Sequence, residues 1–233
     1  NYLNLDASYN NDNAWDVNDS KRYEHEVATM GCRTRVYETL NGPKTSIGRG
    51  NLSFTSINLP RLGIESKGDL DKFFELLDEK MYLVKRQLTK RFKFQCTKHV
   101  YNYPFLMGQG LWKGSEKLGP NDTVEEILGE GSLSIGFIGL AETLIYLIGK
   151  HHGESKEAQE LGIKIVSEIR RMCDQFKKEY KLNFSCYATP AEGLSGHFIG
   201  LDKEKYGVIP GVTDKDYYTN SYHVPVYYMT SIT

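Results

Sequence analysis

Two long amphipathic helices alternate with short apolar strands along this chain, and that alternation restricts the fold more than any other feature. Apolar side chains recur every three or four residues from Asp69 to about Cys96 and again from Glu154 to about Tyr180. Strand-like segments lie before, between and after them, at residues 51–59, 131–140, 183–188 and 223–229. Strands that alternate with helices predict a parallel α/β architecture, in which sites collect where loops leave the carboxyl ends of the strands.

The composition is that of an ordinary globular chain, and it excludes several classes of function. A length of 233 residues suffices for one sizeable α/β domain or two small ones. With 29 basic and 30 acidic residues, the net charge of −1 favours neither nucleic acid nor an acidic membrane surface. No apolar run is long enough to span a bilayer. The chain opens on polar residues without an initiator methionine or a secretory signal, so we expect a fragment of a longer protein.

The four cysteines are widely spaced, at Cys32, Cys96, Cys173 and Cys186. This spacing fits a reducing, cytoplasmic setting and predicts neither a zinc site within the chain nor a dense disulfide framework. We expect Cys96, Cys173 and Cys186 in the core, with a pocket as the alternative surroundings for Cys186. Cys32 differs, because it follows Gly31 at the mouth of a glycine-rich loop, where a thiol is chemically available.

The segment Thr189-Pro190-Ala191-Glu192-Gly193 has two interpretations that the local sequence leaves open. In the first, Thr189 is the N-cap of a helix, Pro190 lies just inside its start, and Glu192 completes a capping box. In the second, the free amides and the positive end of that helix bind an anion such as phosphate. Gly193 and Gly196 would let such a ligand approach closely.

Two further groups of polar residues have structural interpretations that we favour. Asn220, Ser221 and His223 precede the last predicted strand, and they form either a hydrogen-bonded loop or the wall of a polar pocket. His151-His152-Gly153 predicts the end of a helix over residues 141–150, with Gly153 in the left-handed conformation. No third ligand is suggested beside the two histidines, so we expect no metal site in this chain.

Several longer motifs carry a resemblance that extends over nearly the whole chain. They are Met30-Gly-Cys-Arg-Thr-Arg35, Gly48-Arg-Gly-Asn-Leu52, Ser56-Ile-Asn-Leu-Pro-Arg-Leu62, Gly131-Ser-Leu-Ser-Ile-Gly-Phe-Ile-Gly-Leu-Ala-Glu142, Lys150-His-His-Gly-Glu154, Phe184-Ser-Cys-Tyr-Ala-Thr-Pro-Ala-Glu-Gly-Leu-Ser-Gly196 and Tyr217-Tyr-Thr-Asn-Ser-Tyr-His-Val-Pro-Val226. In this order they resemble the anaerobic (class III) ribonucleoside-triphosphate reductases of the glycyl radical enzyme superfamily.

The resemblance implies an α/β fold that is part of a ten-stranded α/β barrel of the glycyl radical enzyme and ribonucleotide reductase type. Residues 1–233 would be a single fragment of the catalytic barrel domain. A cysteine finger loop would occupy about residues 28–50, and the second half-barrel residues 51–233. The N-terminal half-barrel and the C-terminal glycyl radical domain, with its zinc in a four-cysteine site, would lie outside this chain.

The resemblance also implies an oxidoreductase that converts ribonucleoside triphosphates to deoxyribonucleoside triphosphates by thiyl-radical chemistry, for DNA synthesis. Cys32 takes the position of the thiyl, which is formed by a glycyl radical outside this chain and abstracts the 3′-hydrogen of the ribonucleotide. Asn51 is our choice for the family's asparagine that hydrogen-bonds the ribose, with Asn58 as the runner-up. Residues 189–193 would then bind the substrate phosphates.

The partners and effectors expected from the resemblance are formate as reductant, ATP and dNTP as allosteric effectors, and a second copy of the chain in a homodimer. A radical SAM activating enzyme with an iron–sulfur cluster would generate the glycyl radical. No membrane and no nucleic acid would bind directly. Two alternatives stay open: another glycyl radical enzyme of the pyruvate formate-lyase group, and a noncatalytic nucleotide-binding module.

Overall fold

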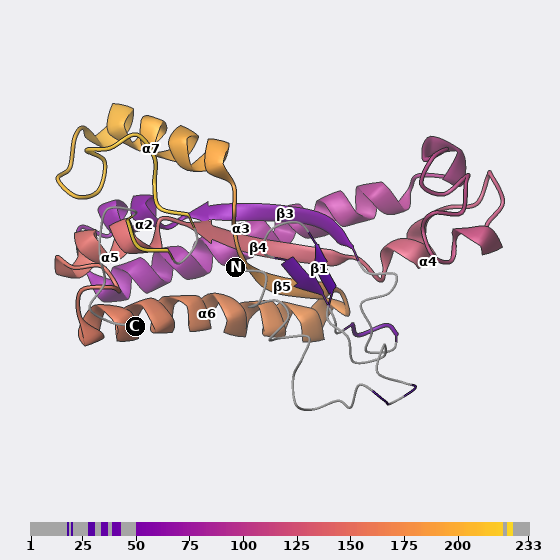
Figure 1. Cartoon of the computed structure of the whole chain (residues 1–233), viewed down its shortest axis with the longest axis horizontal. Coiled ribbons are helices and arrows are strands. Elements are labelled where there is room, and N and C mark those ends of the chain that lie inside the picture. The colour runs from indigo at the N-terminus through magenta and orange to yellow at the C-terminus, as the bar shows by residue number, and fades with distance from the viewer. Residues whose placement is uncertain are drawn as a thin grey trace. The chain divides into compact units, whose positions relative to one another are not determined.

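A three-stranded sheet and two long helices form the frame of the described part of the chain. The computed structural model describes residues 18, 20, 28–30, 34–36, 39–42, 50–220 and 223–225. The strands β3 (Asn51–Asn58), β4 (Ser132–Ile138) and β5 (Asn183–Ala188) are parallel and pair in the order β3-β4-β5 (Figure 1). Helix α3 (Leu70–Cys96) lies between β3 and β4 in the sequence, and α6 (Lys156–Tyr180) lies between β4 and β5. The predicted α/β class is confirmed, and the described strands form part of a sheet.

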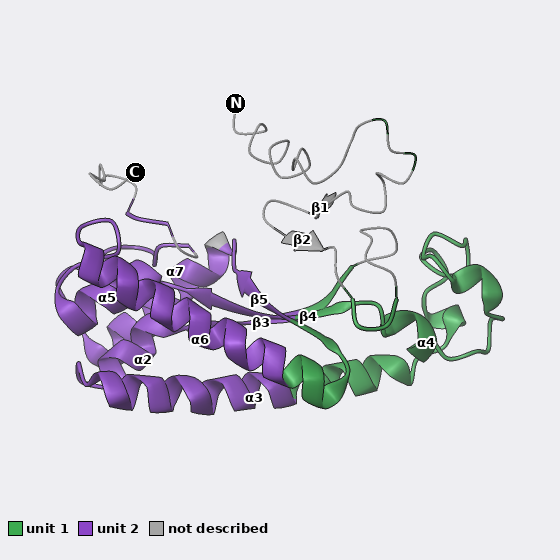
Figure 2. Ribbon diagram, turned by 90° about the horizontal axis from the view of Figure 1, so that it is seen from below, with its two compact units in different colours: residues 1–53, 87–133, 176–184 green, residues 54–86, 134–175, 185–233 purple. Residues whose placement is uncertain are grey.

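The chain divides into two compact units, and each unit consists of three separate segments of the sequence (Figure 2). Unit 1 consists of residues 1–53, 87–133 and 176–184, and unit 2 of residues 54–86, 134–175 and 185–233. The long elements therefore contribute to both units, since β3, β4, β5, α3 and α6 each continue from one unit into the other.

Unit 2 contains most of the sheet and three further helices, α2 (Leu59–Glu65), α5 (Leu140–Ile148) and α7 (Glu192–Tyr206). Within this unit α3 and α6 bury their apolar stripes, which include Phe73, Leu77, Met81, Ile165 and Ile169. Every residue of β4 is buried, because it is the middle strand. Cys173 on α6 is fully buried, as its place on the apolar face predicts.

Unit 1 has its own smaller core, formed by Cys96, Val100, Met107, Val124 and Leu128. Its connecting region from residue 97 to 131 contains only short helices, at Val100–Asn102, Ser115–Lys117 and Glu125–Leu128 (α4). The prediction that Cys96 lies in a core is confirmed. Asn183, at the start of β5, accepts a hydrogen bond from the Leu40 amide at 3.0 Å and so holds residues 39–42 against this unit.

A small antiparallel hairpin precedes the sheet. Its strands are β1 (Ala28–Met30) and β2 (Thr34–Val36), with Met30 opposite Thr34. Cys32, between these strands in the sequence, lies outside the described residues. The last predicted strand, at residues 223–229, is described only over residues 223–225, which form no strand. Among the described helices, none has the length and apolar character needed to cross a membrane.

Candidate functional site

Small polar side chains occupy one face of the sheet in unit 2. Successive side chains of a strand point to opposite faces, so Ser134 and Gly136 on β4 lie on the face opposite Phe137. Phe137 shares a pocket with residues of α6, which places that helix on its side of the sheet. The opposite face carries two hydroxyl pairs, Ser134 with Ser185 at 2.9 Å and Ser56 with Thr189 at 2.7 Å.

The Ser56–Thr189 pair joins β3 to the residue that follows β5, and it crosses the middle strand at Gly136. A Cβ atom at Gly136 would overlap with Thr189 Oγ1 and lie 2.9 Å from Ser56 Oγ. Gly136 is absent from the glycines with positive φ, so its backbone conformation is one that other residues adopt. The glycine is therefore required for the space that it leaves to the two hydroxyl groups.

The turn after β5 differs from the predicted capping box. Helix α7 begins at Glu192, and its N-cap is Ala191, which makes no side-chain capping bond. The prediction that Thr189 is the N-cap and that Pro190 lies inside the helix is wrong. The helix starts three residues after Thr189, and the Thr189 hydroxyl lies 2.7 Å from Ser56 Oγ. The N-cap residue itself therefore offers no capping side chain to the first-turn amides of α7.

A fully buried carboxylate on α7, that of Asp202, fixes the helix against β3 and α2. It accepts hydrogen bonds from Asn58 Nδ2 at 2.7 Å, Arg61 Nε at 2.6 Å and the Tyr218 hydroxyl at 2.8 Å. Burial first, and then the charge of Asp202, raises the pKa of Tyr218 well above its usual range. Asn58 is also the N-cap of α2, because its Oδ1 accepts from the Arg61 amide at 3.3 Å. Both ends of the Asn58 amide are thus used within the fold.

A second buried carboxylate, Glu142 on α5, holds the segment that follows α7. Its Oε1 accepts from the Thr219 amide at 3.0 Å and from the Thr219 hydroxyl at 2.6 Å, and it pairs with Lys215 Nζ at 2.6 Å. The Gly139 amide, at the end of β4, donates to the Thr219 carbonyl. Asn220 pairs with Ile138 in an isolated bridge. These bonds agree with the predicted hydrogen-bonded loop, although Ser221 lies outside the described residues.

The two adjacent histidines have a structural role that differs from the prediction. Helix α5 ends at Ile148, and Gly149, with φ of 80°, takes the left-handed conformation that Gly153 was expected to adopt. His151 is buried, and its Nδ1 accepts from the Gly153 amide at 3.1 Å. Burial lowers the pKa of His151, and the nearby Glu154 carboxylate raises it to a smaller extent. The described residues contain no cluster of three or more side chains suited to a metal ion.

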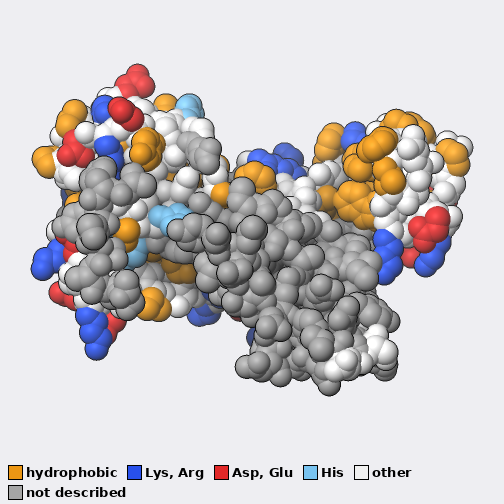
Figure 3. Space-filling view, viewed as in Figure 1, with side chains coloured by type: hydrophobic (Ala, Val, Ile, Leu, Met, Phe, Trp, Pro, Cys, Tyr) orange, Lys and Arg blue, Asp and Glu red, His pale blue; other side chains and the backbone are white. Residues whose placement is uncertain are grey.

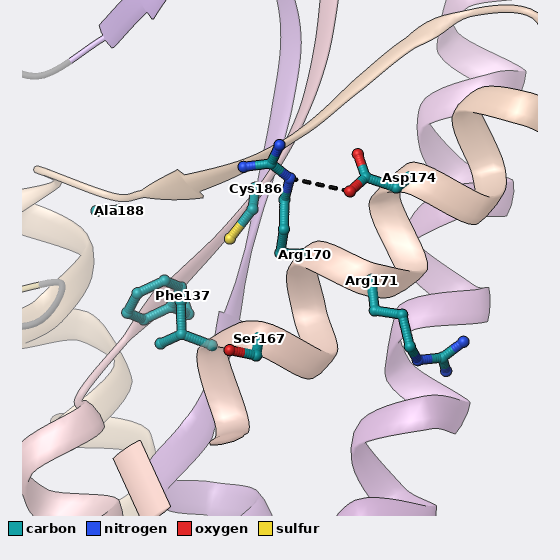
Figure 4. Close-up of a pocket in the computed structure, with 8 residues that line it drawn as sticks. Phe137, Ser167, Arg170, Arg171, Asp174, Cys186 and Ala188 are labelled. Carbon is teal, nitrogen blue, oxygen red and sulfur yellow. Dashed lines mark hydrogen bonds and ion pairs between the residues drawn. The ribbon is translucent and has the colours of Figure 1, made fainter. Parts of the chain in front are cut away.

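Cys186 lines an open pocket of about 610 Å³ between β5 and α6 (Figure 4). The pocket is lined by Phe137, Val166, Ser167, Arg170, Arg171, Asp174, Cys186 and Ala188. The expectation of a core position is therefore wrong, and the alternative of a pocket is confirmed, because β5 is at the edge of the described sheet. Burial raises the pKa of the Cys186 thiol to about 11, against a smaller opposing effect of Arg170. Such a thiol is a poor nucleophile.

The structure separates the two candidate ribose-binding asparagines. Asn51 is the first residue of β3 and is exposed, in unit 1, whereas Asn58 is the last residue of the strand and half-buried, in unit 2. Asn58 contacts the carboxyl-terminal half of α7 through its bond to Asp202. Sequence reasoning gave no role to Ser56, although it begins one of the resemblance motifs, and it missed Asp202, which no motif marks.

Comparisons with known proteins agree on one family. The family model described as anaerobic ribonucleoside-triphosphate reductase matches residues 2–233. The chain is 41% identical over 202 residues to the anaerobic ribonucleoside-triphosphate reductase of Escherichia coli strain K12, which covers 84% of this chain and 28% of that protein. It is 34% identical over 208 residues to the reductase of enterobacteria phage T4, covering 86% of this chain and 32% of that protein.

Solved structures show the same fold. The anaerobic ribonucleotide reductase from Thermotoga maritima with glycerol in the active site matches with a TM-score of 0.59 at 21% identity, covering 83% of this chain and 29% of that one. The complex of this reductase with dATP and CTP matches equally well, with a TM-score of 0.59. The chain spans less than a third of the length of these relatives. The family match over residues 2–233 and the identity of 34–41% show that this chain belongs to the anaerobic ribonucleoside-triphosphate reductases.

Proposed function

We propose that this chain is part of an enzyme that reduces ribonucleoside triphosphates to deoxyribonucleoside triphosphates by thiyl-radical chemistry in the cytoplasm. The observation that carries the proposal is the family match over residues 2–233, with relatives that are themselves named as anaerobic ribonucleoside-triphosphate reductases. Within the enzyme, the chain would supply the finger loop and one half of a ten-stranded barrel. Its contribution to binding would come from the turn after β5 and the start of α7.

The substrate phosphates would bind at residues 189–193. Helix α7 is 15 residues long, and the positive end of its dipole lies at Glu192. Its N-cap, Ala191, makes no side-chain capping bond, and the amides of Glu192, Gly193 and Leu194 would donate to phosphate oxygens. A Cβ atom at Gly193 would meet nothing within 4 Å, which means that a ligand can approach the backbone there.

For the ribose, Asn51 stays our choice over Asn58, because the Asn58 amide serves the fold. Both polar ends of the Asn58 amide are engaged, by the Arg61 amide and by Asp202, and the residue caps α2. Asn51 is exposed at the start of β3. We therefore assign the hydrogen bond to the ribose hydroxyl to Asn51.

Cys32 would supply the thiyl radical. It is the middle one of the three residues that connect the paired strands β1 and β2, although it lies outside the described residues. A thiyl sulfur takes the 3′-hydrogen from the sugar, which leaves a thiol and a carbon radical, so the sulfur must be held in contact with a single C–H bond. A glycyl radical outside this chain would generate the thiyl.

The wider assembly is also part of the proposal. A radical SAM activating enzyme with an iron–sulfur cluster would form the glycyl radical, formate would supply the reducing equivalents, and the four-cysteine zinc site would lie outside this chain. ATP and dNTP would act as effectors on a homodimer. The reductase from Thermotoga maritima has been solved with dATP bound in the specificity site and in complex with dATP and CTP, which supports nucleotide effectors in the family.

Replacing Cys32 in the full-length protein tests the function. With formate and the activating enzyme under anaerobic conditions, Cys32→Ala is expected to abolish deoxynucleotide formation while the glycyl radical signal in electron paramagnetic resonance persists. Cys186→Ala is the matched control, because its poorly nucleophilic thiol lies on the α6 side of the sheet. Undiminished deoxynucleotide formation by Cys32→Ala would remove the thiyl assignment.

A further inference from the structure

We propose that the hydroxyl bridge between Ser56 and Thr189, together with Gly136 beneath it, positions the amino end of α7 and thereby sets the affinity for the substrate phosphates. The inference rests on the proposed function, since it concerns the same phosphate site. It adds two positioning residues, Ser56 and Gly136, which lie on other strands and would not themselves touch the phosphates.

The bridge is a long-range connection within the sheet. Ser56 belongs to β3 and Thr189 follows β5, and β4 lies between those two strands. Side chains on next-but-one strands meet only where the strand between them leaves room above its backbone. Gly136 leaves that room, because any Cβ there would overlap with the Thr189 hydroxyl. The fold thus combines a glycine and two hydroxyl groups at one point above the sheet.

This point lies directly before α7. Thr189 is fully buried, and only Pro190 and Ala191 separate it from the first helical residue. Proline has a fixed φ, so the connection transmits the position of Thr189 to the helix with little freedom. Farther along α7, Asp202 holds the helix through Asn58, Arg61 and Tyr218. The helix therefore has one anchor before its start and one near its carboxyl end.

The amino end of α7 depends on the first anchor. Its N-cap, Ala191, offers no side chain to order the first turn. The amides of Glu192, Gly193 and Leu194 point at a ligand only while the preceding turn is held in place. Loss of the bridge would leave the helix attached through Asp202 and free to shift at the end that faces the phosphates. The expected consequence of this shift is a higher dissociation constant for the substrate phosphates.

The experiment measures dissociation constants of the full-length protein for a ribonucleoside triphosphate and for inorganic triphosphate. The single variants are Thr189→Val, Ser56→Ala and Gly136→Ala. Each is expected to raise both dissociation constants by about three- to tenfold, which corresponds to the loss of one hydrogen bond. Thr189→Ser keeps the hydroxyl and is expected to restore affinity to within about twofold of wild type. The double variant Ser56→Ala/Thr189→Val should bind no more weakly than Thr189→Val alone, because both changes remove the same bond.

Ser134→Ala is the matched control. It removes the other hydroxyl pair on the same face, with Ser185, which lies within β5 and not in the turn before α7. If the bridge served only stability, Ser56→Ala would lower the melting temperature and leave both dissociation constants unchanged, which would overturn the inference. Equal weakening by Ser134→Ala and Ser56→Ala would overturn it as well. Failure of the proposed function is distinguishable, since the unmodified protein would then form no deoxynucleotide with formate and the activating enzyme.

Discussion

The hydroxyl oxygens of Ser56 and Thr189 lie 2.7 Å apart, above Gly136 of the middle strand. This contact brings a residue of the first sheet strand to the start of the helix at which we propose that phosphate binds. Two buried carboxylates, Asp202 and Glu142, hold the same helix and the segment after it. The site is thus supported by polar contacts between elements that are far apart in the sequence.

The buried carboxylate of Asp202 is expected to contribute strongly to stability. Asp202→Asn would place amide hydrogens against the donors of Asn58 or Tyr218 and would leave Arg61 without its ion pair. We expect a loss of about 3 kcal/mol in the free energy of unfolding. Denaturant unfolding of the protein measures it. Asp216→Asn, at an exposed carboxylate on the loop after α7, should cost less than about 0.5 kcal/mol; equal effects of the two changes would contradict the assignment.

The Glu142–Lys215 pair is expected to show strong coupling. Glu142 is fully buried and the Lys215 side chain is 19% exposed. Lys215→Met leaves a buried carboxylate without its counter-ion, so we expect a loss of about 2 to 3 kcal/mol. Adding Glu142→Gln should recover part of this loss, because the amide oxygen can still accept from Thr219. A double-mutant cycle on unfolding free energies gives the coupling, and strictly additive losses would count against the pair.

Protonation of His151 is expected to make the fold less stable in mild acid. Burial lowers the pKa of His151 below the ordinary value of 6.5, so the unfolded chain binds the proton more tightly than the folded one. Stability conferred by the neutral ring is therefore present above pH 6.5 and is lost as the pH falls below it. Protonation would also place a hydrogen on Nδ1, against the amide of Gly153.

The measurement is the melting temperature between pH 7.5 and 5. His151→Asn should lower the melting temperature at pH 7.5 and reduce its dependence on pH. His197→Asn, at an exposed histidine of α7, is the control and should keep the pH dependence of the unmodified protein. If the His151 variant kept that full dependence, another group would be responsible for it.

The Cys186 thiol is expected to react slowly despite its pocket. With a pKa of about 11 instead of 9.0, its thiolate fraction at pH 8 is about a hundredfold smaller than that of an ordinary cysteine. Alkylation by iodoacetamide, followed by peptide mass spectrometry, should accelerate roughly tenfold per pH unit up to about pH 11. Arg170→Gln should slow it further, because Arg170 lowers this pKa, whereas Arg171→Gln should have little effect. A fast reaction at pH 7 would refute the assignment.

The sequence predicted the regular elements well, because hydrophobic periodicity is a local property. The helices expected from Asp69 and from Glu154 begin at Leu70 and Lys156, and the strand expected at residues 183–188 has those bounds. The family resemblance, carried by motifs in a fixed order, is confirmed by the match over residues 2–233. The local pattern wrongly predicted a core position for Cys186, because the burial of a residue on an edge strand depends on what packs beside that edge.

Only the tertiary structure decided how the candidate site is held together. Nothing near Thr189 in the sequence indicates that its hydroxyl bonds to Ser56, which is 133 residues away. The same holds for Asp202, whose three partners come from β3, α2 and the loop after α7. The sequence by itself determined which segments are strands and helices and which family they belong to. Their pairing across the sheet decided which polar groups meet, since a hydrogen bond depends on distance in space and not on separation along the chain.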